Sequence, residues 1–185
     1  VRLFGAAFET GAPGIVVDSL GVGALNYEQM THVDSDTRRQ LLKERPYDLV
    51  MFLLGTNMFA PDKHEAWMKT ALADFAAAMP ETPIVVLSPP DSGMTTKDWT
   101  SNPRLGRLSE QLREIAARND WAYWDFYAAM GGKGSIRHFV KEGLAERDCI
   151  HFSRDGGALM GRRIAQARVS HVTQARERDA SLGCG

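Results

Sequence analysis

The amino-acid sequence predicts an α/β protein, a three-layer α/β/α sandwich built on a mostly parallel sheet. Short apolar runs alternate along the chain with longer segments of helical periodicity, which is the pattern of strand–helix–strand units. The apolar runs are continuous rather than alternating, as in strands that are buried on both faces. The 185 residues suffice for one domain with a sizeable core.

Four apolar runs have the length of strands. The first ends at Asp18, the second is closed by Gly55, and the third is stopped by Pro89 and Pro90. The fourth is short and aromatic, and it lies just after a helical segment. The predicted strands are Gly14–Val17, Asp48–Leu54, Pro83–Ser88 and Trp121–Asp125.

Four segments show helical patterns between and after these strands. The first ends before Pro46, the second is alanine-rich and stops at Pro80, and the third has Pro103 in its first turn. The last one carries Leu159 and Ile164 on its inward face. The predicted helices are Thr37–Lys43, His64–Met79, Pro103–Asn119 and a final helix from Arg154 or Asp155 to about Val169.

Composition narrows the choice of partners. The 22 basic and 23 acidic residues give a net charge of −1, which removes the charge argument for binding nucleic acid or an anionic membrane. No stretch approaches the roughly 20 apolar residues of a membrane span. Cys149 and Cys184 define neither a disulfide framework nor a metal site. We expect one domain over residues 1–169 and a polar, disordered tail over residues 170–185.

The first candidate for chemistry is the Gly21-Val22-Gly23 segment, which follows the first predicted strand. Ligands bind at the carboxyl ends of strands in parallel sheets. The backbone N–H of a glycine in such a loop can point at a developing oxyanion. A tight turn is the other interpretation. A dinucleotide-binding fingerprint fits less well, because Asn26 stands where its third glycine would be.

The second candidate is Asn57, in the Gly55-Thr56-Asn57 segment that follows the second predicted strand. An asparagine amide supplies a hydrogen-bond donor without a charge, as an oxyanion hole requires. Asn57 could equally cap the following turn or helix.

The third candidate is the pair Asp148 and His151, just before the last helix. An aspartate can accept from one imidazole nitrogen, which leaves the other nitrogen as a general base. A solvated surface pair is the alternative, and a metal site is weak because further ligands at the usual spacing are missing. The Gly131–Ser135 segment resembles a phosphate loop only in part, and we expect a flexible loop there. The remaining histidines, His32, His64, His138 and His171, are expected on the surface.

Taken together and in this order, the three segments resemble the SGNH (GDSL-type) hydrolases, a family of esterases and lipases. The resemblance covers about residues 13–168. It implies a flavodoxin-like fold, a Ser-His-Asp triad and no metal or organic cofactor. In the family's pattern, Gly23 and Asn57 match the oxyanion donors, and His151 and Asp148 match the catalytic base and acid.

A closer resemblance is to bacterial esterases that remove O-acetyl groups from peptidoglycan and other carbohydrates. Gly14–Gly21 and Trp124–Gly132 look like the corresponding segments of that subgroup. This resemblance implies a small-molecule or glycan acyl ester as substrate, acetyl in particular. It also implies a periplasmic or extracellular location.

The family's serine block is missing, since no Gly-Asp-Ser segment precedes the glycine block. We expect the nucleophile to lie upstream of Val1, so that this chain lacks the first strand of the family fold and is inactive alone. One alternative makes Ser19 the nucleophile, within Asp18-Ser19-Leu20. Another is a non-catalytic carbohydrate-binding or assembly module on the same fold.

Overall fold

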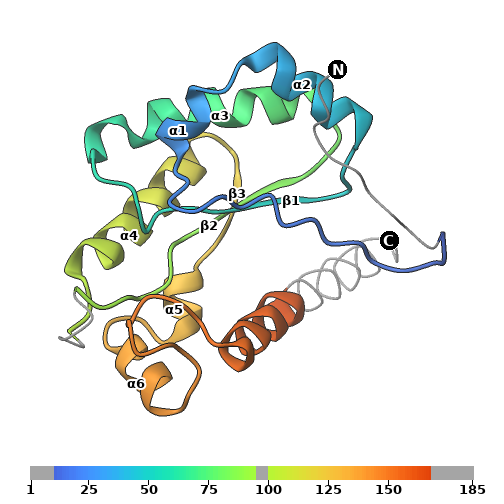
Figure 1. Ribbon diagram of the computed structural model, residues 1–185. Helices are drawn as coiled ribbons and strands as arrows, with labels where there is room; N and C mark the ends of the chain where they lie inside the picture. The colour runs from blue at the N-terminus through green and yellow to red at the C-terminus, as the bar shows by residue number, and fades with distance from the viewer. Residues whose placement is uncertain (1–10, 95–99, 168–185) are drawn as a thin grey trace, which may run out of the picture.

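The computed structural model describes residues 11–94 and 100–167. Within these ranges, helices surround a small central sheet (Figure 1). A further helix, without a label, covers residues 154–167. The labelled elements are α1 (Tyr27–Thr31), α2 (Ser35–Glu44), β1 (Val50–Leu53), η1 (Pro61–Lys63), α3 (His64–Ala78), β2 (Ile84–Leu87), α4 (Pro103–Arg118), β3 (Ala122–Trp124), α5 (Phe126–Met130) and α6 (Ser135–Lys141).

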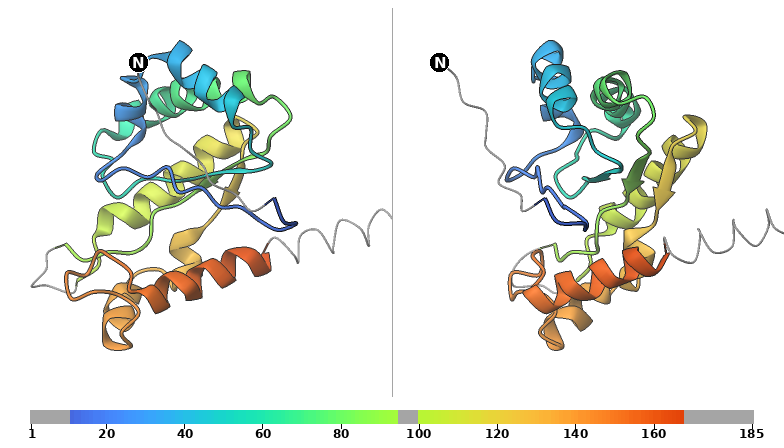
Figure 2. Two further views of the ribbon diagram at one scale, coloured as in Figure 1. Left: turned by 45° about the vertical axis from the view of Figure 1, so that its right-hand side comes forward. Right: turned by 90° about the vertical axis from the view of Figure 1, so that its right-hand side faces the viewer.

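Three parallel strands form the sheet in the order β1-β2-β3. Phe52 lies opposite Val86, and both belong to a core cluster packed with α1, α2, α3 and α4. The next residue, Leu87, belongs to a second cluster that contains residues of α5, α6 and the 154–167 helix. Helices therefore cover both faces of the sheet, as Figure 2 shows, and the predicted α/β/α class is confirmed.

Most of the predicted helices form close to their expected bounds, because local signals fix their ends. Asp34 caps α2 by accepting the backbone N–H of Thr37. Asn102 caps α4, which has Pro103 in its first turn. The short helices η1, α5 and α6 were not predicted, and neither was α1. Its start is a capping box, in which Asn26 and Gln29 each accept the other's backbone N–H.

The predicted strand at Gly14–Val17 is wrong, since no strand forms there. Ile15 is 93% exposed, and Val17 is exposed as well. An apolar, β-branched run becomes a strand only where a neighbouring strand supplies ladder hydrogen bonds. Residues 17–21 instead face β1 across a cavity, so the two segments cannot form a ladder.

The expectation for His64 is also wrong, because it is buried with only 3% of its surface exposed, whereas His32 and His138 are exposed as expected. His64 begins α3 and packs against Gln111 of α4, whose Oε1 lies 3.0 Å from His64 Nδ1. His171 and the predicted tail lie outside the described residues.

A buried ion pair joins the helices above the sheet. Arg38 of α2 donates from Nε to Oδ2 of Asp74 in α3 at 2.9 Å, and its guanidinium also reaches the Met30 carbonyl at the end of α1. Ser35 donates to the same carboxylate oxygen at 2.9 Å. These bonds join α1, α2 and α3, and the Gly23 loop leads into α1. In the part of the chain that the structure describes, no helix is both long and apolar enough to cross a membrane.

Candidate active site

Asp148 and His151 form a hydrogen-bonded pair on the loop before the 154–167 helix. Asp148 Oδ2 lies 2.6 Å from His151 Nδ1, and the His151 side chain is 75% exposed. The other oxygen, Oδ1, accepts the backbone N–H groups of Ile150 and His151 at 2.9 and 3.0 Å. The carboxylate therefore closes the loop and orients the imidazole at once.

The bonds to Asp148 favour its ionised form. The hydrogen bond with the His151 side chain, together with the backbone N–H groups, lowers the pKa of Asp148 to about 2. An ionised carboxylate can only accept, so Nδ1 of His151 carries the proton. When the imidazole is neutral, its Nε2 has a free lone pair, and this atom makes no hydrogen bond to any described residue.

Backbone contacts hold this loop in place. Glu146 N–H donates to the His151 carbonyl at 2.8 Å, and Ser153 N–H donates to the Leu144 carbonyl at 3.1 Å. Cys149, at φ 60°, is buried between Asp148 and Ile150 and turns the chain. Gly156, in the first turn of the following helix, packs so closely on Leu144 that a Cβ would overlap the Leu144 carbonyl oxygen.

Gly23 lies in an exposed turn in which Leu25 N–H donates to the Val22 carbonyl at 3.1 Å. Ala24 adopts φ 60°, a left-handed conformation that is rare for a residue with a side chain. The Gly23 N–H makes no hydrogen bond within the described residues, and nothing lies within 4 Å of where a Cβ would stand. This N–H is therefore available to a ligand.

Asn57 follows β1, and side chains from two other segments form hydrogen bonds with the backbone around it. Asn26, three residues after Gly23, donates from its side chain to the Asn57 carbonyl at 3.0 Å, which joins the glycine loop to the asparagine loop. Arg104 of α4 donates to the Thr56 carbonyl at 2.6 Å and also to the Met58 carbonyl, one residue to each side of Asn57. The Asn57 side chain itself makes no hydrogen bond with any described residue, so it caps no helix there.

Asn26 and Arg104 were not predicted as site residues. The capping-box pattern Asn26-x-x-Gln29 could have identified the first of them as the start of a helix beside the glycine loop. Nothing in the sequence signals Arg104, because its partners are 46 and 48 positions away along the chain.

The segment at residues 17–21 runs beside β1 and leaves an open apolar cavity of about 510 Å³ between them. Asp18 holds the segment in place by accepting hydrogen bonds from Arg45 and, at 3.0 Å, from the Tyr47 hydroxyl. Beyond the segment, Asn26 holds the chain through its bond to the Asn57 carbonyl. Figure 1 shows this blue segment running in the same direction as β1. Apolar side chains on both walls are exposed: Val17, Leu20, Met51 and Leu53.

The structure joins some of the predicted site residues and not others. It pairs Asp148 with His151, and it links the loops of Gly23 and Asn57 through Asn26. Within the described residues, no serine hydroxyl bonds to His151. Ser19 lines the cavity beside β1 and is exposed. Among the described residues, no cluster of three or more His, Cys, Asp or Glu side chains could hold a metal ion.

Comparison with known proteins finds one matching family and several solved structures with a similar fold. The model of the GDSL-like lipase/acylhydrolase family matches residues 1–159. No curated protein matches the sequence. Among solved structures, a peptidoglycan O-acetylesterase superposes with a TM-score of 0.76 at 21% identity, over 84% of this chain and 46% of its own. This chain thus spans less than half of that protein.

Two further structures share the fold. A carbohydrate esterase of family 3 from Talaromyces cellulolyticus has a TM-score of 0.56 at 14% identity, over 82% of this chain and 70% of its own. Est24, a carbohydrate acetylesterase from Sinorhizobium meliloti, has a TM-score of 0.52 at 17% identity, over 74% of this chain and 67% of its own.

Proposed function

The chain belongs to the GDSL-like lipase/acylhydrolase family, and from this we propose that it is the hydrolase domain of a serine esterase. Its substrates are small acyl esters, acetyl esters in particular, on a carbohydrate or cell-wall glycan. The observation that carries the proposal is the bond between Asp148 and His151, which sets an ionised carboxylate behind an exposed imidazole. The likeness to a peptidoglycan O-acetylesterase and to carbohydrate esterases supports the substrate class.

The reaction would proceed through an acyl-enzyme. A serine oxygen attacks the acyl carbon while His151 Nε2 takes the hydroxyl proton, and the tetrahedral intermediate carries its charge on the former carbonyl oxygen. The Gly23 N–H and the Asn57 amide donate to this oxyanion. His151 then protonates the leaving sugar oxygen. In the second half, His151 activates a water molecule that releases the acid and restores the serine.

The nucleophile in this proposal comes from a strand outside residues 1–185, seated between residues 17–21 and β1. The cavity there is apolar on both walls and lies along the edge of β1 that pairs with no strand within the described residues. An open edge strand readily pairs with an added strand. A parallel strand in this slot would end near the loops of Gly23 and Asn57, which Asn26 ties together. Ser19 as the nucleophile has less support, since no bond joins it to His151 within the described residues.

Labelling with a fluorophosphonate, together with turnover of p-nitrophenyl acetate, tests the proposal. The 185-residue chain should show neither labelling nor turnover. The product of the longer reading frame, if it encodes an upstream Gly-Asp-Ser segment, should be labelled at that serine. Substituting His151→Gln should abolish this labelling, whereas the exposed control His138→Gln should retain it.

Two other outcomes would contradict the proposal. Labelling of the 185-residue chain at Ser19 would make Ser19 the nucleophile. A reading frame without the Gly-Asp-Ser segment, combined with glycan binding and no labelling, would instead indicate a non-catalytic carbohydrate-binding module.

A further inference from the structure

A second cavity, of about 520 Å³, lies beside the Asn57 loop, and the mechanism does not use it. Met58 and Phe59, which directly follow Asn57, form one wall, and α4 forms another. None of the residues that line the cavity is acidic, whereas two of them are arginines, Arg104 and Arg107. The permanent charges on the side chains that line the cavity are thus both positive, and the carboxylate with an effect on His64 is that of Asp62, outside the lining.

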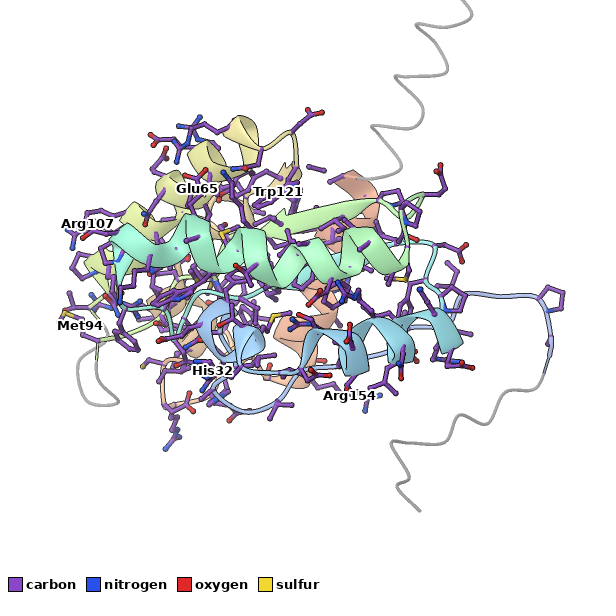
Figure 3. All side chains as sticks on the ribbon, turned by 90° about the horizontal axis from the view of Figure 1, so that it is seen from above. His32, Glu65, Met94, Arg107, Trp121 and Arg154 are labelled. Carbon is purple, nitrogen blue, oxygen red and sulfur yellow. The ribbon has the colours of Figure 1, made fainter. Side chains whose placement is uncertain are left out.

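The two arginines have no carboxylate partner among the described residues. The Arg104 guanidinium stacks on the Phe59 ring, 4.5 Å from its centroid, while its nitrogens hold the Thr56 and Met58 carbonyls. Arg107 is exposed and makes no hydrogen bond or ion pair to a described residue. Figure 3 shows Arg107 at the edge of the molecule. Its planar group of donors suits an anion such as a carboxylate.

Phe59 adds an apolar surface. Phe59 is 73% exposed although it follows the buried Met58, so the ring stands out from the core beside the cavity. An exposed aromatic ring can pack against the flat, apolar face of a sugar ring. The combination of a ring and a nearby guanidinium suits a sugar that carries an acidic group.

His64, which also lines the cavity, has an unsatisfied acceptor. Gln111 donates from Nε2 to the Pro61 carbonyl at 2.8 Å, so its Oε1 faces His64 Nδ1 as an acceptor. Nδ1 of His64 must then carry the proton, which leaves a bare lone pair on Nε2. This buried atom has no partner among the described residues. A buried acceptor without a donor is costly, and a hydroxyl or an ordered water in the cavity would satisfy it.

We propose that this cavity is a subsite for a carboxylate-bearing sugar, in which Arg107 binds the carboxylate and Phe59 packs on the sugar ring. This inference rests on the proposed function, since it names the kind of glycan whose acyl ester would reach Asn57. Arg104 links the two sites, because it lines the subsite and holds both carbonyls that flank Asn57. The substrate of the esterase would accordingly be an acidic glycan.

Binding to the 185-residue chain, followed by NMR, tests the subsite without any need for turnover. The probes are N-acetylmuramic acid, N-acetylglucosamine (which lacks the lactyl carboxylate) and glucuronic acid. At least one of the two acids should bind about tenfold more tightly than N-acetylglucosamine, the factor expected for one charge-assisted hydrogen bond. The one that binds identifies the source of the carboxylate as a lactyl ether or a uronic acid. Resonances of Phe59 and Arg107 should shift.

Arg107→Gln should remove the preference for the acid, and Arg107→Lys should retain part of it. The matched control is Arg162→Gln on the 154–167 helix, an exposed arginine that lines neither cavity, and it should leave the preference unchanged. Equal affinity for acidic and neutral sugars would overturn the subsite, as would an unchanged preference in Arg107→Gln. If the acidic sugar binds as expected but the serine of the longer protein is not labelled, the subsite proposal stands and the esterase proposal fails.

Discussion

Nδ1 of His151 lies 2.6 Å from Oδ2 of Asp148, on a loop that Asp148 closes by accepting the backbone N–H groups of Ile150 and His151. One carboxylate thus fixes both the loop and the imidazole.

Substituting Asp148→Asn should change the tautomer of His151. An amide can turn its NH₂ toward Nδ1, and the proton then moves to Nε2, where it blocks the lone pair that the proposed mechanism uses. Nitrogen NMR of the 185-residue chain should therefore show mainly the Nε2-protonated form. In a protein that carries the proposed upstream Gly-Asp-Ser segment, kcat should fall on the order of 10³- to 10⁴-fold. Unchanged tautomer populations would argue against an orienting role for Asp148.

Gly156→Ala should destabilise the protein by about 1–3 kcal/mol, a cost typical of overpacking. The added Cβ would overlap the carbonyl oxygen of Leu144, which also accepts from Ser153, so the start of the helix must move. Gly157→Ala is the matched control, because nothing lies within 4 Å of its Cβ position. Urea denaturation of both variants measures the difference, and equal free energies of unfolding would rule out the close approach.

Asp74→Ala should destabilise the protein by about 3 kcal/mol, because it leaves the buried Arg38 charge without its partner. The exposed pair of Asp36 and Arg39 supplies the control, and Asp36→Ala should cost less than about 1 kcal/mol. Chemical denaturation measures both. Similar losses of stability in the two variants would mean that burial does not increase the contribution of the Arg38–Asp74 pair to stability.

Stability should fall as the pH decreases below about 6.5, in part because of His64. Burial lowers the pKa of His64, so the unfolded chain binds a proton more readily than the folded one. The contribution of neutral His64 to stability is complete above its pKa in the unfolded chain. It is lost as the pH falls toward the lower pKa that His64 has in the folded protein. Urea midpoints between about pH 5 and about pH 7.5 should show this slope. His64→Gln should flatten it, whereas the exposed control His32→Gln should not.

Local signals in the sequence are enough to predict several of the elements. Apolar periodicity and Pro103 defined α4 almost to the residue, and the continuous apolar runs defined the parallel strands β1 and β2. The pairing of Asp148 with His151 also needs only a three-residue spacing in one loop. In each case the interacting groups are close along the chain, so the local sequence pattern is enough to predict the structure.

Features that depend on partners far away along the chain follow only from the packing of the fold. Gly14–Val17 has strand-like residues but no ladder, because strand formation requires a paired neighbour. His64 is buried because α4 brings Gln111 against it, 47 positions further along the chain. Arg104 reaches the Asn57 loop in the same way. Contacts of this kind depend on how helices and strands pack, which no local pattern encodes.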